Sequence, residues 1–224
     1  KPTQGKTVSP IQTKEMGERL LKQFKSGSQY KLDPQFWVEV NKKSAEYVSE
    51  GYYERADKYD EMINVSYVIE QNVDASLGYI LAMSRSKFNP QKQGAEEGLW
   101  RMSNEFVTVN SFNVMCGTET IGDASQNCAT KASALYLKAI YLNVFERDII
   151  YSVAAFGMSP QEAAAWKASL PADRKDFGKI ITSPKQREEI IRFFAAGIVA
   201  ENPQKFGLKK DKPLSDLYKI TMGN

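Results

Sequence analysis

The 224-residue chain contains no histidine and only two cysteines. Without imidazole it can form neither a Ser-His nor a Cys-His catalytic pair, and no metal or haem site that uses histidine. Two thiols are too few for a four-thiolate zinc or iron–sulfur site within one chain. We therefore expect no cofactor and no metal, so any chemistry must rest on carboxylates, hydroxyls, amines or tyrosines.

Long apolar runs and a strong charge bias are also missing. No run approaches the roughly 20 apolar residues that span a bilayer, so we expect no transmembrane segment. Residues 1–10 lack the apolar stretch of a signal peptide, so an export signal has been removed or never existed. Thirty Lys and Arg against 27 Asp and Glu leave a net charge of +3. That bias is too small to indicate a nucleic-acid partner.

The sequence does contain capping residues and prolines at the spacing that is typical of helix starts. Asp33-Pro34 places a capping residue before a proline and predicts a helix to about Ser49. Ser159 and Ser183 each open a capping box with proline in the first turn, and the second helix should end near Ala200. Further helices are predicted at 55–72 (one apolar stripe), after Asp74 as a cap, and at 129–145 and 148–156. Because no stretch alternates with period two, we expect an all-α fold.

Residues 88–128 break this pattern, because Gly, Asn, Ser and Gln interrupt every apolar stripe, and a small hairpin or irregular loops would fit. Cys116 and Cys128 flank a polar stretch there. They are either two unrelated buried thiols or a disulfide that closes the loop and stabilises it by about 3 kcal/mol. The loop-like surroundings favour the disulfide, and hence an exported, oxidising compartment.

Several motifs, in order along the chain, resemble the goose-type lytic transglycosylases. Residues 84–90 (SRSKFNP) and 98–102 (GLWRM) are similar to that family's Glu-Ser-x-Phe-Asn-Pro and Gly-Leu-Trp/Met-Gln-x-Met motifs. Farther on, 153–158, 176–180 and 200–208 fall where the family has three later motifs, and the last looks like the ending of the membrane-bound type D subgroup. The resemblance implies an all-α, lysozyme-like domain. We divide the chain into a flexible arm (1–10), an N-terminal helical segment (11–54), the transglycosylase-like domain (55–210) and a tail (211–224).

The family's chemistry depends on a glutamate that this chain lacks. In the family, one Glu protonates the glycosidic oxygen of peptidoglycan and then, as base, helps a 6-hydroxyl close an anhydro ring. Alignment on Phe88-Asn89-Pro90 places Arg85 at that position. An arginine keeps its proton at any ordinary pH and cannot exchange the two roles. The resemblance therefore implies a catalytically inactive protein.

The resemblance also gathers five residues into one expected cleft for glycan or an anion: Arg85, Trp100, Arg101, Phe156 and Phe177. Trp100 is either a core residue or a platform on which a sugar ring stacks. Arg85 and Arg101 would hold carboxylates of the peptide stems through bidentate hydrogen bonds.

Alternatively, Arg85 pairs with a neighbouring acid such as Glu96, Glu97 or Asp148 and plugs the cleft. We expect a periplasmic bacterial protein, anchored or not to the outer membrane, that binds a glycan strand or stem peptide or scaffolds an envelope protein. One alternative is an active transglycosylase that uses Glu96 or Glu97 as a displaced acid. Another is a protein-interaction module with a blocked cleft.

Overall fold

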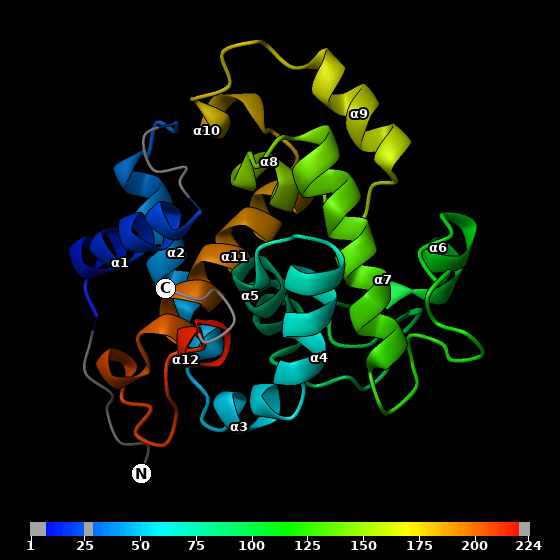
Figure 1. Cartoon of the computed structure of the whole chain (residues 1–224). Helices are drawn as coiled ribbons and strands as arrows, with labels where there is room; N and C mark the ends of the chain where they lie inside the picture. The colour runs from blue at the N-terminus through cyan, green and yellow to red at the C-terminus, as the bar shows by residue number, and fades with distance from the viewer. Residues whose placement is uncertain (1–7, 25–28, 220–224) are drawn as a thin grey trace.

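The computed structural model describes residues 8–24 and 29–219, and their secondary structure is helical apart from one short hairpin (Figure 1). In chain order these are α1 (Pro10–Gln23), α2 (Pro34–Ser44), α3 (Tyr52–Asp57), α4 (Asp60–Asn64), α5 (Ala75–Ser86), α6 (Asn104–Val109), α7 (Asn127–Leu137), α8 (Ile149–Ala154), α9 (Pro160–Ser169), α10 (Phe177–Ile180), α11 (Pro184–Glu201) and α12 (Ser215–Tyr218). Two 3-10 helices, η1 (Ala45–Tyr47) and η4 (Pro203–Phe206), and two π-helices, η2 (Val65–Glu70) and η3 (Lys138–Val144), complete them. The predicted all-α class is confirmed.

The helix starts follow the local capping chemistry. The side chains of Asp33, Ser159 and Ser183 each accept a hydrogen bond from a backbone N–H in the first turn of α2, α9 and α11, and proline follows each cap. These three predicted starts are confirmed. Asp74 does precede α5, but its side chain makes no capping bond and instead accepts from Tyr141 Oη at 3.0 Å. Its predicted role as a cap is therefore wrong.

The helix predicted over 55–72 is divided, and its apolar stripe does not all face the core. The segment consists of the end of α3, then α4, then the π-helix η2. Ile63 and Tyr67 are fully buried, whereas Val65 and Ile69 are 40% and 69% exposed. A π-turn contains an extra residue, so side chains that would share one face of an α-helix are rotated away from it. The resulting register brings Tyr67 Oη to 2.7 Å from Ser133 Oγ on α7.

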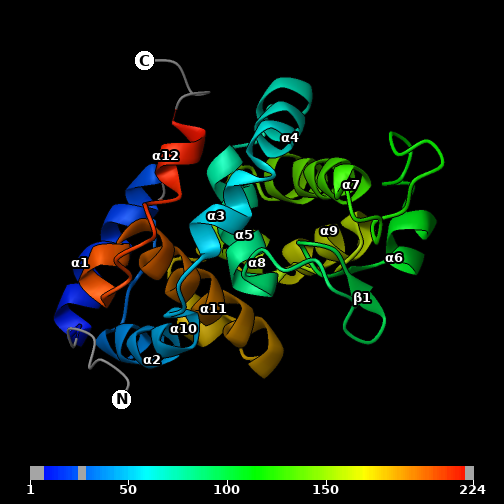
Figure 2. The ribbon, with the colours of Figure 1, turned by 90° about the horizontal axis from the view of Figure 1, so that it is seen from below.

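Helix α5 lies at the centre of the molecule, with α1 and α2 on one side and α6 and α7 on the other (Figures 1 and 2). Of its twelve residues only Arg85 is not buried. Helix α11 packs against both α2 and α5, and α1 packs against α2 and α11. Gly17 permits this close contact, because a Cβ there would lie 2.1 Å from Cζ3 of Trp37. The N-terminal helical segment thus shares one core with the rest of the chain.

The interrupted region 88–128 contains a small hairpin, one of the two arrangements that the sequence allows, and also the short helix α6. Strands β1 (Glu96–Glu97) and β2 (Met102–Ser103) pair antiparallel, with Glu96 opposite Ser103 and Glu97 opposite Met102. Cys116 and Cys128 form a disulfide, which confirms that prediction. The hairpin carries residues 98–101 across the C-terminal end of α5, as the hydrogen bond from Ser86 Oγ to Leu99 O shows.

Residues 211–219 are packed, although the sequence predicts a tail from residue 211. Asp211 is only 2% exposed, and its carboxylate accepts from the backbone N–H groups of Gly51 and Tyr53. These are orphan donors at the start of α3, so Asp211 caps that helix from a distant part of the chain. Leu214 and Tyr218 are buried as well, and the expectation of a solvated tail is wrong for this stretch.

Candidate functional site

Arg85 stands in the last turn of α5 and is held from several elements at once. Its Nε donates to Trp100 O at 2.7 Å and its Nη2 to Arg101 O at 3.1 Å, both on the hairpin. Its Nη1 donates to Glu189 Oε1 on α11 at 2.8 Å. The guanidinium also lies 4.1 Å from the ring centre of Phe156, which follows α8. The side chain is therefore fixed in one orientation.

The charge of Arg85 is compensated mainly by Glu189. The two side chains are 10% and 12% exposed, so little water screens the pair. Glu96 Oε2 lies farther away, 3.8 Å from Nη2, and that side chain is 56% exposed. Of the three predicted partners, Glu96 alone reaches Arg85.

The other two predicted acids lie elsewhere. Asp148 pairs with Arg174 at 3.4 Å, and the Glu97 carboxylate lies against the backbone at Gly122. Glu189 was missed because it lies 104 residues from Arg85 along the chain. A signal for it does exist: Lys185, Glu189 and Arg192 follow the i, i+4, i+7 spacing of one helix face.

A pocket of about 380 Å³ opens beside the ion pair, and we call it the Arg85 pocket. Phe106, Phe156 and Met102 give it an apolar wall, while Ser103, Lys185 and Glu189 supply polar groups. Gly157 leaves one side open, since a Cβ there would meet no atom within 4 Å. The space is wide enough for part of a small molecule or a sugar ring.

Arg101 lines the same pocket, but its guanidinium is hydrogen-bonded to the backbone of the loop before the hairpin. It adopts a left-handed backbone conformation (φ 53°), which non-glycine residues seldom take. Its Nη1 donates to Gln91 O, and its Nη2 donates to Asn89 O at 3.0 Å. Nε is buried and has no partner among the described residues. Burial lowers the pKa of this guanidinium, and the nearby charge of Arg85 acts in the same direction.

Trp100 belongs to the core and is not available as a platform for a sugar. The side chain is 1% exposed, its Nε1 donates to Gly78 O at 2.9 Å, and its ring stacks on Tyr67. Its placement follows from the hairpin, which folds residues 98–101 over α5. Of the two roles predicted for Trp100, the structure shows the core residue, and its expected place in the cleft is wrong.

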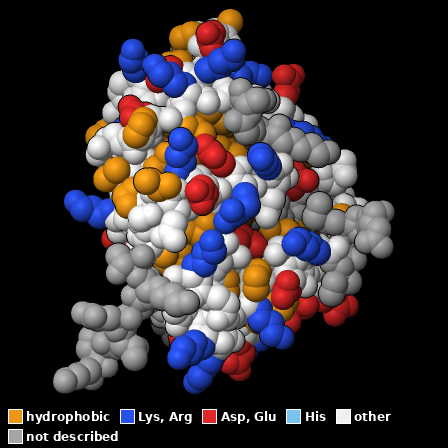
Figure 3. Space-filling model, turned by 90° about the vertical axis from the view of Figure 1, so that its left-hand side faces the viewer, with side chains coloured by type: hydrophobic (Ala, Val, Ile, Leu, Met, Phe, Trp, Pro, Cys, Tyr) orange, Lys and Arg blue, Asp and Glu red, His pale blue; other side chains and the backbone are white. Residues whose placement is uncertain are grey.

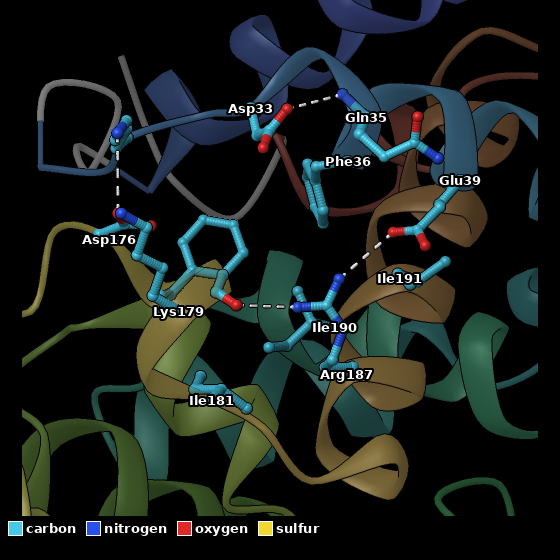
Figure 4. A pocket seen from close by; sticks show the side chains of 13 residues that line it. Asp33, Gln35, Phe36, Glu39, Asp176, Lys179, Ile181, Arg187, Ile190 and Ile191 are labelled. Carbon is cyan, nitrogen blue, oxygen red and sulfur yellow. Dashed lines mark hydrogen bonds and ion pairs between the residues drawn. The ribbon is translucent and has the colours of Figure 1, made fainter.

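Phe177 does not join the Arg85 pocket either. It packs edge-on against Phe36 with ring centres 5.3 Å apart, and it lines a separate cavity of about 170 Å³ between α2, α10 and α11 (Figure 4). The charged rim of that cavity is largely paired: Arg187 bonds Glu39, and Asp176 lies near both Lys31 and Lys179. Of the five predicted cleft residues, the structure brings together Arg85, Arg101 and Phe156.

The carboxyl groups around Arg85 are those of Glu189 and Glu96. Oε1 of Glu189 accepts from Arg85, its Oε2 is buried without a partner among the described residues, and Glu96 is exposed on the hairpin. Arg85 itself keeps its proton. A glycosidase acid, in contrast, is held in an apolar pocket.

Comparison of the chain with protein-family models, with curated proteins and with solved structures found no match in any of the three. Within residues 8–24 and 29–219, no three His, Cys, Asp or Glu side chains lie close enough to hold a metal ion. In the same part of the chain, no helix is both long and apolar enough to cross a bilayer.

Proposed function

We propose that this protein is a catalytically inactive, lysozyme-like relative of the lytic transglycosylases that binds peptidoglycan glycan in the periplasm through the Arg85 pocket. One observation carries the proposal. The residue at the position that the resemblance assigns to the acid is a guanidinium fixed by Glu189 and two backbone carbonyls, beside an open pocket.

Loss of the acid argues against turnover. General acid–base catalysis contributes roughly 10²- to 10⁴-fold to a rate, and an arginine supplies none of it. The runner-up enzyme would need Glu96 or Glu97 to act in its place. The Glu97 carboxylate lies against Gly122, and Glu97 does not line the Arg85 pocket. The Glu96 carboxylate lies beside a guanidinium and is exposed to water, which is the reverse of the apolar surroundings that a glycosidase acid requires.

The lining of the pocket supports a glycan ligand. Sugars present hydroxyl groups at their edges and apolar C–H faces, so they bind where polar groups converge beside an aromatic side chain. Ser103 and Lys185 supply polar groups here, and Phe106 and Phe156 supply the aromatic wall. The volume also falls within the range of small-molecule sites.

A second candidate function is a protein-interaction module without glycan affinity. The Arg85–Glu189 pair favours it, because the pair fills the position where substrate would meet the acid. In that case the fold would serve as a scaffold for an envelope protein and the remaining pocket would have no ligand.

Sedimentation with purified sacculi, followed by mass spectrometry of released muropeptides, separates these functions. The informative variant is Lys185→Trp, since Lys185 is an exposed residue at the pocket. Lys138→Trp, exposed on η3, is the matched control. We expect the native protein and Lys138→Trp to sediment with sacculi, Lys185→Trp to remain in solution, and no anhydro-muropeptides above blank.

Each other outcome identifies an alternative. Release of anhydro products that Glu96→Gln abolishes would establish the displaced-acid enzyme. Absence of sedimentation by the native protein would favour the interaction module. Equal sedimentation of the two tryptophan variants would place any glycan site away from Arg85.

A further inference from the structure

A second hollow, of about 540 Å³, lies between η1, the end of α5 and α11, and we call it the Tyr47 hollow. Its lining is rich in cations: Lys43, Arg85, Lys87, Arg101 and Arg192 face only two carboxylates, Glu46 and Glu188. On the face of the molecule in Figure 3, Lys and Arg side chains are interspersed with Asp and Glu side chains. The hollow thus concentrates positive charge in a protein whose net charge is small.

Two of these five cations form ion pairs with carboxylates, and the other three do not. Lys43 pairs with Glu188 at 2.7 Å and with Glu46 at 3.2 Å, which uses both acids of the hollow. Arg85 pairs with Glu189. Lys87, Arg101 and Arg192 have no carboxylate within 4 Å in the part of the chain that the structure describes.

Arg192 and Lys87 are held in place around Tyr47. Arg192 Nε donates to Tyr47 Oη at 3.2 Å and its Nη2 to Ser84 O at 3.0 Å, while Nη1 has no partner among the described residues. Lys87 Nζ lies 5.6 Å from the ring centre of Tyr47. Because the guanidinium is already oriented, a ligand that binds Nη1 would lose little of its affinity to ordering that side chain.

Two buried polar atoms on the lining residues also have no partner. They are Arg101 Nε and Ser84 Oγ, on residues that are 5% and 2% exposed. Buried polar atoms in native proteins nearly always have a partner, so each of these two atoms keeps an unused hydrogen-bonding capacity on a residue that lines the hollow. Both atoms can donate a hydrogen bond, which makes an acceptor the suitable partner.

We infer that the Tyr47 hollow is a binding site for an oxyanion, either a phosphate or the carboxylate of an acidic sugar. Guanidinium and ammonium groups bind such oxygens through charge-assisted hydrogen bonds. Glu188 and Glu189 act on the charge of Arg192 from beyond 4 Å, and Glu96 acts on that of Arg101. The C-terminal end of α5 opposes an anion with roughly half an elementary charge, which is less than the three cations without an ion pair supply.

The inference does not need the proposed function. The hollow and the Arg85 pocket share Arg85, Arg101 and Arg192. However, Lys87 lines only the hollow and Lys185 lines only the pocket.

Isothermal titration calorimetry of the whole protein tests the inference. The titrants are sodium phosphate, N-acetylmuramic acid and, as controls, neutral N-acetylglucosamine and sodium chloride, all at matched ionic strength. We expect saturable binding of phosphate, of N-acetylmuramic acid or of both, and no binding of chloride. We expect Lys87→Gln to weaken that binding at least tenfold and Lys138→Gln to leave it unchanged.

Lys87 is a suitable position because its side chain makes only a ring contact, so its exchange removes no hydrogen bond from the fold. Binding of phosphate alone, of N-acetylmuramic acid alone or of both supports the site and identifies its source of oxyanion. Heats for both acids equal to that of chloride would overturn the inference. So would equal affinities in the two lysine variants. Lys185→Trp should bind the oxyanion normally, so loss of sacculus binding and loss of this site are distinguishable.

Discussion

Nη1 of Arg85 and Oε1 of Glu189 lie 2.8 Å apart and join α5 to α11 across 104 residues of sequence. The pair takes the place where the resemblance predicts a single protonatable carboxyl. A buried ion pair costs desolvation energy, so its presence indicates little about stability, but the loss of one partner leaves the other charge uncompensated. Removal of one partner should therefore change the free energy of unfolding much more than removal of both.

Arg85→Met should lower the free energy of unfolding by about 3–5 kcal/mol, because it strands the Glu189 carboxylate in a buried site. Arg85→Met/Glu189→Met should recover most of that loss, since two apolar side chains carry no charge to desolvate. Urea denaturation of the four proteins in a double-mutant cycle measures the coupling. Additive effects of the two single changes would contradict the pair as described.

Gly17→Ala should destabilise the protein by about 1–3 kcal/mol through overpacking against Trp37. Alanine favours helices by about 1 kcal/mol over glycine, but the new Cβ would lie 2.1 Å from Cζ3 of Trp37. The control is Gly178→Ala, whose Cβ would approach nothing closer than 3.8 Å. Thermal unfolding of both variants tests this, and equal melting temperatures would show that α1 does not pack on α2 in this way.

Removal of the disulfide should cost about 3 kcal/mol, the value expected for closing a loop of this length. Cys116 and Cys128 are separated by 12 positions, so the bond restricts a short segment of the unfolded chain. The variant Cys116→Ser/Cys128→Ser should therefore have a lower urea midpoint of unfolding than the native protein. A reducing agent should lower the midpoint of the native protein to the same value. If reductant leaves the native midpoint unchanged, the two thiols are not joined in solution.

Glu201 should make stability depend on pH. Burial raises the pKa of this carboxyl, although hydrogen bonds from Tyr218 and Ser215 act in the opposite direction. The folded state therefore keeps the proton to higher pH than the unfolded state does. The contribution of Glu201 is complete below the unfolded pKa and is lost as pH rises through the folded pKa.

The stability advantage of the native protein over Glu201→Gln should accordingly shrink from pH about 4 upward. Guanidinium denaturation at several pH values measures that difference, with Glu50→Gln as the exposed control. A difference that grows with pH would reverse the assigned direction of the shift.

Much of the fold was predictable because helix starts are a local property. Asp33, Ser159 and Ser183 bond amides two or three residues away, so the sequence alone determines their chemistry. The packed segment after residue 210 was not predictable in this way. Asp211 caps an amide 160 positions away, at Gly51, and read locally it is one charge within a lysine-rich run.

The residues of the candidate site likewise fall into those that the sequence predicts and those that depend on distant packing. Arg85 and Phe156 lie together, as the ordered motifs predict, with the guanidinium over the ring. Trp100 and Phe177 could not be placed, because no pattern along the chain states which way the hairpin folds over α5 or which cavity receives α10. The spacing of Glu189 and Arg192 places them on one face of a helix, but they belong to no family motif, and only the packing of α11 on α5 brings them to Arg85 and Ser84.

The cap that Asp211 places on α3 has a consequence for how the protein is made. Helix α3 lies in the first third of the chain, yet its first turn acquires the Asp211 cap only after that residue has left the ribosome. The central helix α5 likewise stays uncovered on one side until α11 is synthesised. Native structure around α5 therefore cannot complete before α11 has been synthesised, and until then the growing chain exposes apolar surface that favours aggregation.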